Sequence, residues 1–144
     1  MKPPDPLALF WDMAQLADPV VSHDDLVRMP RATRDALRTA DLLAPYRSAH
    51  SVVCDACAEG HVEEVDAVTR PNGVTQLFIC CPENGRIEVD PERLRQWTPR
   101  YGAVAGLIVE SLDTRGGCRE TVPGRVWDLG CVVVAGQLHD VWLV

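Results

Sequence analysis

Apolar residues in the first fifty positions recur at helical spacing in three short stretches. The first stretch covers residues 6–17 and begins with a proline, which suits the first helical position. Ser22, with Asp25 three residues later, predicts the cap of a second helix that ends near Met29. A third helix is expected to begin at Pro30. Three short helices followed by an extended segment are typical of a winged helix-turn-helix.

The middle of the chain changes to the alternating pattern of β-strands. Residues 58–69 alternate, and residues 70–73 (Arg-Pro-Asn-Gly) form a strong turn signal. Residues 74–80 then predict a returning strand, and residues 86–89 predict a third strand. We therefore expect a small antiparallel sheet in this segment.

Apolar residues dominate the last third of the chain. Pro91 predicts a helix start, and residues 101–112 continue as a helix that is hydrophobic almost all round. Such a helix is expected to be buried by the rest of the chain or by a partner. Three strands follow over residues 119–122, 125–134 and 137–144, with an Ala-Gly link that predicts a hairpin between the last two.

Cysteines at two turns of the predicted sheet have the spacing of a metal site. Cys54 and Cys57 are two residues apart, which lets both sulfurs bind one ion. Cys81 begins the opposite turn, where Pro82 fixes φ and Gly85 tolerates a positive φ. Two such turns around a tetrahedral Zn²⁺ are typical of a zinc ribbon.

The fourth zinc ligand is not fixed by this pattern. Asn84 stands where a full ribbon has its fourth cysteine, and an amide is a poor zinc ligand. We expect His61 to complete the site, because a neutral imidazole is a common partner of three cysteines. Cys80 is the second candidate, although adjacent residues of a strand point to opposite faces, and a water is the third.

Two other chemistries of this motif are disfavoured. A redox C-x-x-C needs a βαβ context with its first cysteine at a helix N-terminus, whereas a strand is predicted here. His61 and Glu63 resemble the H-x-E pair of zinc deaminases, but those enzymes carry their C-x-x-C downstream of that pair.

The predicted fold class is α+β. We expect a winged-helix-like helical segment over residues 1–50 and a zinc-ribbon β-hairpin over residues 51–90. Residues 91–144 are expected to form a long apolar helix and a C-terminal antiparallel β-hairpin that pack with the ribbon. A chain of 144 residues has room for one domain or two very small ones.

Composition favours a cytoplasmic protein with reduced thiols. The chain has no run of 18 apolar residues and no apolar segment of a signal peptide at its start, so no membrane association is expected. Six cysteines in a reducing compartment favour metal binding over disulfides. Of these, Cys118 and Cys131 are interpreted as core thiols. The net charge of −7 argues against a large nucleic-acid footprint.

Cations nevertheless gather on the polar side of the third predicted helix. Arg31, Arg34 and Arg38 lie three and four residues apart, with Arg28 just before them. They either enter a groove of duplex DNA or form a solvated face, which is the commoner case.

The chain resembles a group of uncharacterised bacterial proteins in which a short helical, helix-turn-helix-like segment precedes a zinc ribbon. The resemblance covers about residues 30–144. It favours Cys81 over Cys80 as a ligand and strengthens His61, but it implies a layout and no reaction. The matching residues are Cys54, Cys57, Gly60, His61, Cys81, Pro82, Gly85, Glu88, Pro123, Gly124, Arg125, Trp127 and Gly130.

These observations favour a non-enzymatic zinc-binding regulatory module that acts in transcription or another DNA transaction. The alternative is a protein-protein interaction or dimerisation domain with purely structural zinc and no DNA contact. Because Val144 lies inside the last predicted strand, we expect either a longer natural chain or a partner chain over that strand. An enzyme with an open zinc position would need Glu63, Glu64 or Glu83 as its base, and ribbon sites are usually closed. No small-molecule substrate is inferred.

Overall fold

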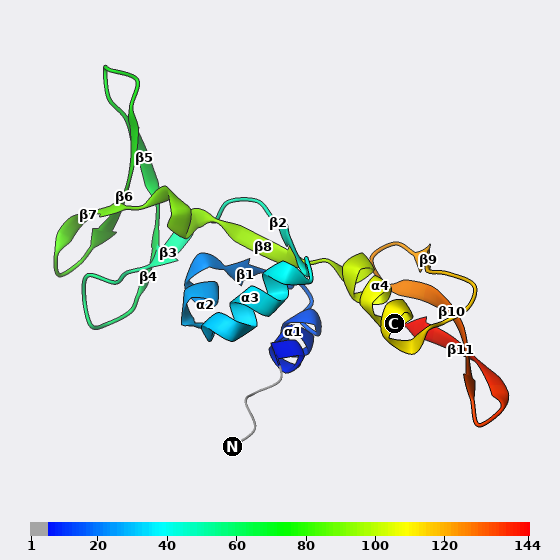
Figure 1. Cartoon of the computed structure of the whole chain (residues 1–144). Coiled ribbons are helices and arrows are strands. Elements are labelled where there is room, and N and C mark those ends of the chain that lie inside the picture. Colours follow the sequence, from blue (N-terminus) through cyan, green and yellow to red (C-terminus); the bar gives the residue numbers. More distant parts are fainter. Residues whose placement is uncertain (1–5) are drawn as a thin grey trace. The chain divides into compact units, whose positions relative to one another are not determined.

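The computed structural model describes residues 6–144, and its contacts divide the chain into two compact units (Figure 1). One unit comprises Met1–Trp11, Arg31–Ala44 and Pro99–Val144, and the other comprises Asp12–Pro30 and Pro45–Thr98. The second unit holds the cysteine-rich turns, and it is described first.

The cap expected at Ser22 is present in the second unit. Strand β1 (Val21–Ser22) leads into helix α2 (His23–Arg28). The Ser22 Oγ accepts a hydrogen bond from the Asp25 N–H at 3.1 Å, and the Asp25 carboxylate accepts one from the Ser22 N–H at 3.1 Å. This reciprocal pair satisfies two backbone donors that a helix start leaves free, which confirms the prediction from the spacing.

Two small antiparallel sheets form the cysteine-rich part of this unit. In the first, β3 (Ser51–Val53) pairs with β4 (Val62–Glu64). In the second, β6 (Thr75–Cys81) lies between β5 (Asp66–Thr69) and β7 (Gly85–Val89). The single strand expected across residues 62–68 is thus two strands.

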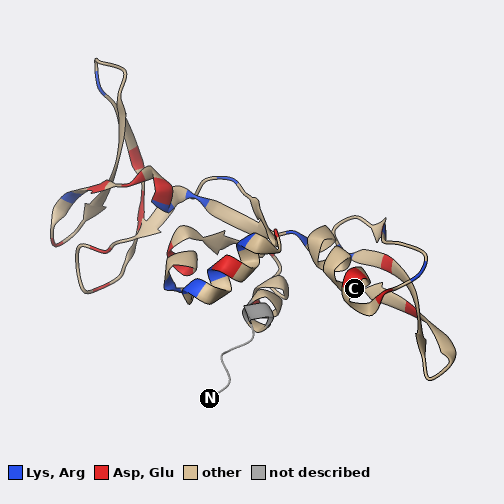
Figure 2. Ribbon diagram, in the orientation of Figure 1, with Lys and Arg blue, Asp and Glu red and all other residues tan. Residues whose placement is uncertain are grey.

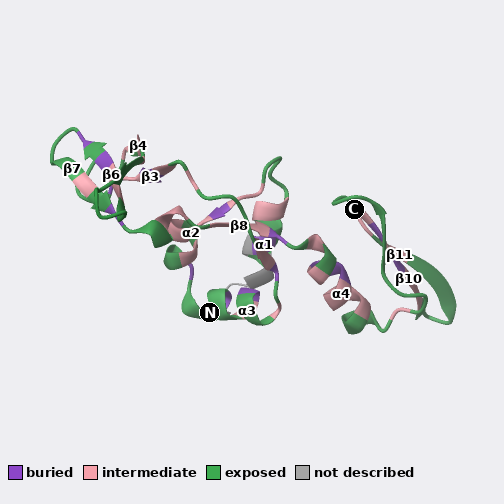
Figure 3. Cartoon of the chain, turned by 90° about the horizontal axis from the view of Figure 1, so that it is seen from above, coloured by how far each residue is buried: buried purple, intermediate pink, exposed green. Residues whose placement is uncertain are grey.

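Val65 marks the break between those two strands. Its N–H donates to the carbonyl of His50 at 2.9 Å, and its side chain packs against the buried cluster beneath the sheets. This cluster joins both sheets, and Figure 3 colours its buried positions purple. Its buried members are Val52, Cys54, Ile79, Cys81 and Val89. Two of them are cysteines at the turns, so the core and the candidate metal site are continuous.

The helix expected to start at Pro91 is only a 3-10 turn, η1 (Pro91–Leu94). The chain then extends as strand β8 (Gln96–Pro99), which pairs with β1 through Val21 and Trp97. Pro99 cannot donate a helical hydrogen bond, and the sheet supplies the backbone partners that a helix would have supplied. Strand β8 is the middle strand of the order β1–β8–β2, where β2 is Leu43–Pro45.

The first unit contains helix α3 (Arg31–Thr39) and most of helix α1 (Pro6–Ala14). Leu37 and Thr33 are the buried residues of α3. Asp41 follows with φ of 54°, in the left-handed region that commonly ends a helix. Its carboxylate pairs with Arg100, whose N–H donates to the carbonyl of Leu42 at 2.8 Å.

The C-terminal part of the first unit is one helix on a three-stranded sheet. Helix α4 (Tyr101–Leu112) packs on β10 (Val126–Val134), which lies between β9 (Arg119–Val122) and β11 (Gln137–Leu143). The core of this sheet is Ala105, Trp127 and Leu129. Ala135 and Gly136, with φ of 51° and 79°, make the expected two-residue link of the hairpin β10–β11.

The predicted fold class, with its winged-helix-like segment and long apolar helix, is wrong. The described part of the chain is 38% strand and 27% helix, with four small antiparallel sheets and four short α-helices. Helix α4 has the predicted bounds but only 12 residues, because β8 replaces the helix expected before it. None of the helices in residues 6–144 has both the length and the apolar character needed to cross a bilayer.

Candidate metal centre

The first knuckle is the loop of residues 54–61 between β3 and β4. Cys54 directly follows β3, and its N–H donates to the carbonyl of His61 at 2.8 Å, which closes the loop. Gly60 has φ of 63°, a conformation that glycine adopts without strain, and it turns the chain back. This geometry brings Cys54, Cys57 and His61 together on one loop.

The second knuckle is the turn of residues 81–85 between β6 and β7. Cys81 is the last residue of β6 and pairs with Gly85 across the hairpin. The backbone N–H groups of Glu83 and Asn84 point at the Cys81 sulfur from within the turn. The turn therefore holds Cys81 in place with donors that favour a thiolate.

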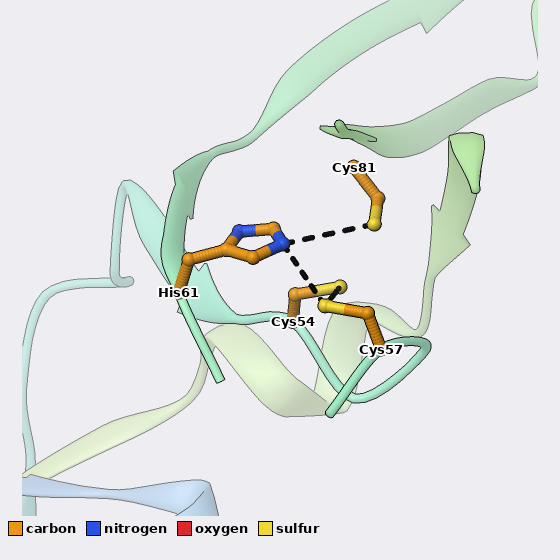
Figure 4. A group of neighbouring side chains, drawn as sticks. All are labelled: Cys54, Cys57, His61 and Cys81. Atoms are coloured by element: carbon orange, nitrogen blue, oxygen red, sulfur yellow. Dashed lines mark hydrogen bonds between the residues drawn. The ribbon is translucent and has the colours of Figure 1, made fainter. Parts of the chain in front are cut away.

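Four ligand atoms from the two knuckles converge on one point. The atoms of Cys54, Cys57, His61 and Cys81 all lie within 4.8 Å of one another. Figure 4 shows the His61 imidazole turned toward the sulfurs, with its Nε2 3.1 Å from Cys57 Sγ and 3.6 Å from Cys81 Sγ. The sulfurs of Cys54 and Cys57 are 3.8 Å apart. These four residues are positioned to hold a metal ion.

In the metal-free chain, the protonation states of the clustered side chains are compatible with metal binding. Burial acts to raise the pKa of Cys81, but hydrogen bonds from the backbone of Asn84 and Glu83 and from His61 lower it to about 6. The same contact with Cys81 is the main reason that the pKa of His61 is raised. Burial raises the pKa of Cys57. Cys81 is thus a thiolate near neutral pH, which is the form that binds metal.

Two further side chains support the ligands. The Oε1 of Glu63 lies 2.8 Å from the Nδ1 of His61, on the side of the ring away from the sulfurs. A carboxylate in this place fixes the ring so that Nε2 faces the metal. The amide of Asn84 donates to the carbonyl of Ala56 at 2.8 Å and to Cys81 Sγ at 3.7 Å, which links the two knuckles.

The cluster decides between the open candidates for the fourth ligand. His61 lies in it, whereas Cys80 is exposed and outside it. Asn84 occupies the place of a fourth cysteine but binds the other knuckle. Sequence reasoning missed the part played by Glu63, although it lies two residues after His61, where the extended chain enters β4 and alternate residues share a face. Cys118 is exposed, so its interpretation as a core thiol is wrong.

The predicted DNA-contacting arginines lie exposed on α3 (Figure 2). The side chains of Arg31 and Arg38 are 88% and 86% exposed, at 3.6 Å and 3.8 Å from the Asp35 carboxylate between them. Arg34 is also exposed. Three cations against one carboxylate leave this face with a net positive charge.

Comparisons of this chain with protein-family models, with curated proteins and with solved structures found no match.

Proposed function

We propose that the chain is a non-enzymatic, zinc-binding regulatory module whose Cys₃His centre holds the two knuckles together. The observation that carries this proposal is the convergence of Cys54, Cys57, His61 and Cys81 within 4.8 Å. A tetrahedral ion with Zn–S bonds of about 2.3 Å separates its sulfurs by about 3.8 Å. The separation between Cys54 and Cys57 is 3.8 Å, so these sulfurs fit that ion.

The donor set supports zinc with a structural role. Thiolates with one imidazole suit Zn²⁺, whereas Mg²⁺ and Ca²⁺ prefer oxygen ligands. Four protein ligands fill a tetrahedral site, which leaves no open position for a substrate or an activated water. The ribbon core has a cluster of only five buried residues, so a metal that binds only the folded chain would supply much of its stability.

Elemental analysis of purified protein tests the metal proposal. We expect one zinc per chain, retained through gel filtration, and its loss in Cys57→Ser. Cys80→Ser is the matched control, because Cys80 adjoins Cys81 but is exposed and lies outside the cluster. Protein that folds without stoichiometric metal, or equal zinc loss in both variants, would contradict the proposal.

The regulatory part of the proposal is contact with duplex DNA through α3. It is supported by the exposure of Arg31, Arg34 and Arg38 and by the single carboxylate among them. Such contacts would be made to phosphates, since guanidinium groups bind phosphate oxygens readily. With a chain charge of −7, binding would be weak and confined to low ionic strength.

Fluorescence anisotropy with a labelled duplex, between about 50 mM and about 200 mM salt, tests this contact. The triple change of Arg31, Arg34 and Arg38 to Gln is expected to abolish binding. Each lost phosphate contact should reduce the slope of log K against log salt by about 0.9. A second triple change removes the same charge from the C-terminal sheet region, at Arg115, Arg119 and Arg125. Equal loss in both triples, or no binding at low salt, would refute the DNA contact.

The alternative function is a protein-protein interaction or dimerisation domain with structural zinc and no DNA contact. Exposed apolar side chains on β11 and directly after it favour this function. Leu138, Trp142 and Val144 are 64%, 51% and 93% exposed. Strand β11 is also an edge of its sheet, which is a template for further strand pairing. Light scattering that finds a dimer, reduced to monomer by Leu138→Lys, would support this function. A strict monomer at high concentration would count against dimerisation.

A further inference from the structure

We infer that metal binding at the Cys₃His centre holds helix α2 in place, and that Arg93 is the connection between them. This inference rests on the proposed metal centre. It adds a regulatory consequence, because a change in zinc occupancy would change the order of a helix that contributes no metal ligand. All the residues involved belong to the same compact unit.

Arg93 joins α2 to the first knuckle with three contacts. Its Nη2 donates to the Asp24 carboxylate on α2 at 3.1 Å and to the carbonyl of Val53 at 2.7 Å. Its Nη1 lies 3.0 Å from the Asp55 carboxylate. The Arg93 and Asp24 side chains are 16% and 29% exposed, so their contact is less screened than a surface pair, whereas Asp55 is 67% exposed.

The contacts on the knuckle side depend on the metal ligands. Val53 and Asp55 are the two neighbours of Cys54, and Asp55 lies inside the C-x-x-C turn that an ion would close. The backbone hydrogen bond between Cys54 and His61 spans this loop, but it does not fix the conformation of the turn itself. Without the ion, the turn gains freedom and the carboxylate of Asp55 loses its fixed place beside Arg93.

Helix α2 has little packing of its own, with His23, Asp24 and Leu26 only half-buried. It has six residues and none of them is buried, and an isolated helix of this length is unstable in water. A cavity of about 170 Å³ lies beside Arg93, and its lining includes Asp25 and Arg28 of α2 and Val52 and Val62 of the ribbon sheet. Direct packing between α2 and this sheet is therefore incomplete.

The turn η1 provides the mechanical basis of the connection. Leu94 packs against the ribbon core, while its neighbour Arg93 reaches α2. The other attachments of α2 are its cap at Ser22 and the hydrogen bond from the His23 N–H to the Arg95 carbonyl at 3.1 Å. These lie at the first turn of the helix, and buried Met29 follows its end, so Arg93 adds a side-chain anchor to a helix that is at most half-buried. Met29 and Pro30 alone join α2 to α3, which bears the arginines.

Hydrogen exchange of the full chain, followed by mass spectrometry, tests the connection. Zinc-loaded protein is compared with protein stripped by a chelator, and the readout is the peptide covering residues 23–30. We expect this peptide to exchange about tenfold faster without zinc, because a charged hydrogen-bonded contact is lost. The peptide covering β8, which pairs with β1 in the same unit as α2, serves as an internal reference for unfolding of that unit. A slow α2 peptide in stripped protein would overturn the inference.

Two variants separate the connection from general loss of the fold. In zinc-loaded Arg93→Gln and in zinc-loaded Asp24→Asn, we expect full zinc content together with fast exchange in α2. Arg95→Gln is the control, because the Arg95 side chain pairs with exposed Glu92 at 2.9 Å. We expect this change to leave hydrogen exchange in α2 unaltered. Zinc-bound Arg93→Gln with a slow α2 peptide would overturn the connection while the metal centre stands. Absence of zinc in the unaltered protein would overturn the metal centre and this inference with it.

Discussion

The contact between Glu63 and His61 allows a quantitative test of the proposed centre. The Oε1 of Glu63 lies 2.8 Å from Nδ1, and the two side chains are 28% and 23% exposed. A negative charge beside Nδ1 favours the tautomer that carries its proton there, so the lone pair on Nε2 would face a bound ion and the ring would be a more basic ligand. The change Glu63→Gln keeps the size of the side chain and removes its charge.

The expected loss follows from measured effects of outer residues on other metal sites, which are about 10- to 100-fold in affinity. We expect the lower end, about tenfold or ~1.4 kcal/mol, because water reaches both side chains and Gln still presents an acceptor. Glu63→Ala removes the acceptor as well, and it should fall toward the upper end of that range.

Competition with a chromophoric zinc chelator at fixed pH measures these affinities. Glu64→Gln is the matched control, since the adjacent strand residue is exposed and points to the other face of β4. We expect the control to bind zinc as the unaltered protein does. Equal zinc affinities for Glu63→Gln and the unaltered protein would refute the role of Glu63. Equal losses of affinity in Glu63→Gln and Glu64→Gln would show a general effect of charge instead.

Three further predictions concern stability and pH. Ile79→Ala removes a fully buried side chain beside the ligands, and denaturant unfolding of zinc-loaded protein should show a loss of about 2–5 kcal/mol. Gly130 has φ of 81°, and a Cβ there would overlap the Arg115 carbonyl, whereas a Cβ at Gly136 would meet no other atom. Gly130→Ala should therefore lower the melting temperature more than Gly136→Ala, and equal shifts would contradict this prediction. Acid should release zinc more steeply below pH 6, because the pKa of Cys81 is lowered to about 6, and an indicator titration that finds no steepening there would contradict it. The pKa of Cys81 in the fold lies below its ordinary 9.0, so the thiolate also stabilises the metal-free fold. This stabilisation is fully present above pH 9 and is lost as the pH falls through about 6.

Features that depend on near neighbours in the sequence were predictable. The spacing of Ser22 and Asp25 indicated the cap, and the Ala-Gly pair at 135–136 indicated the hairpin link. The spacing of Cys54 and Cys57 indicated a shared site, and the cluster contains both. In each case the interacting groups are a few residues apart, so the local backbone conformation brings them together and the residue types reveal it.

The error at residues 91–99 has the opposite origin. Leu94 and Trp97 are spaced as on a helix, but Trp97 pairs with Val21 in a strand. Val21 is far from Trp97 in the sequence, and no pattern of nearby residues predicts this pairing. Propensity is a weak guide where tertiary pairing satisfies the backbone in another way.

The amino-acid sequence by itself therefore determined the turns, the caps and three cysteines of the candidate site. The sequence favoured His61 but left Cys80 open, and only the tertiary structure placed Cys80 outside the cluster, because that depends on which face of a strand meets the first knuckle. The tertiary structure alone also placed Arg93 against Asp24, 69 residues apart in the chain. Contacts over such separations form when the whole core closes around them, so their geometry belongs to the fold and cannot be found in residue spacing.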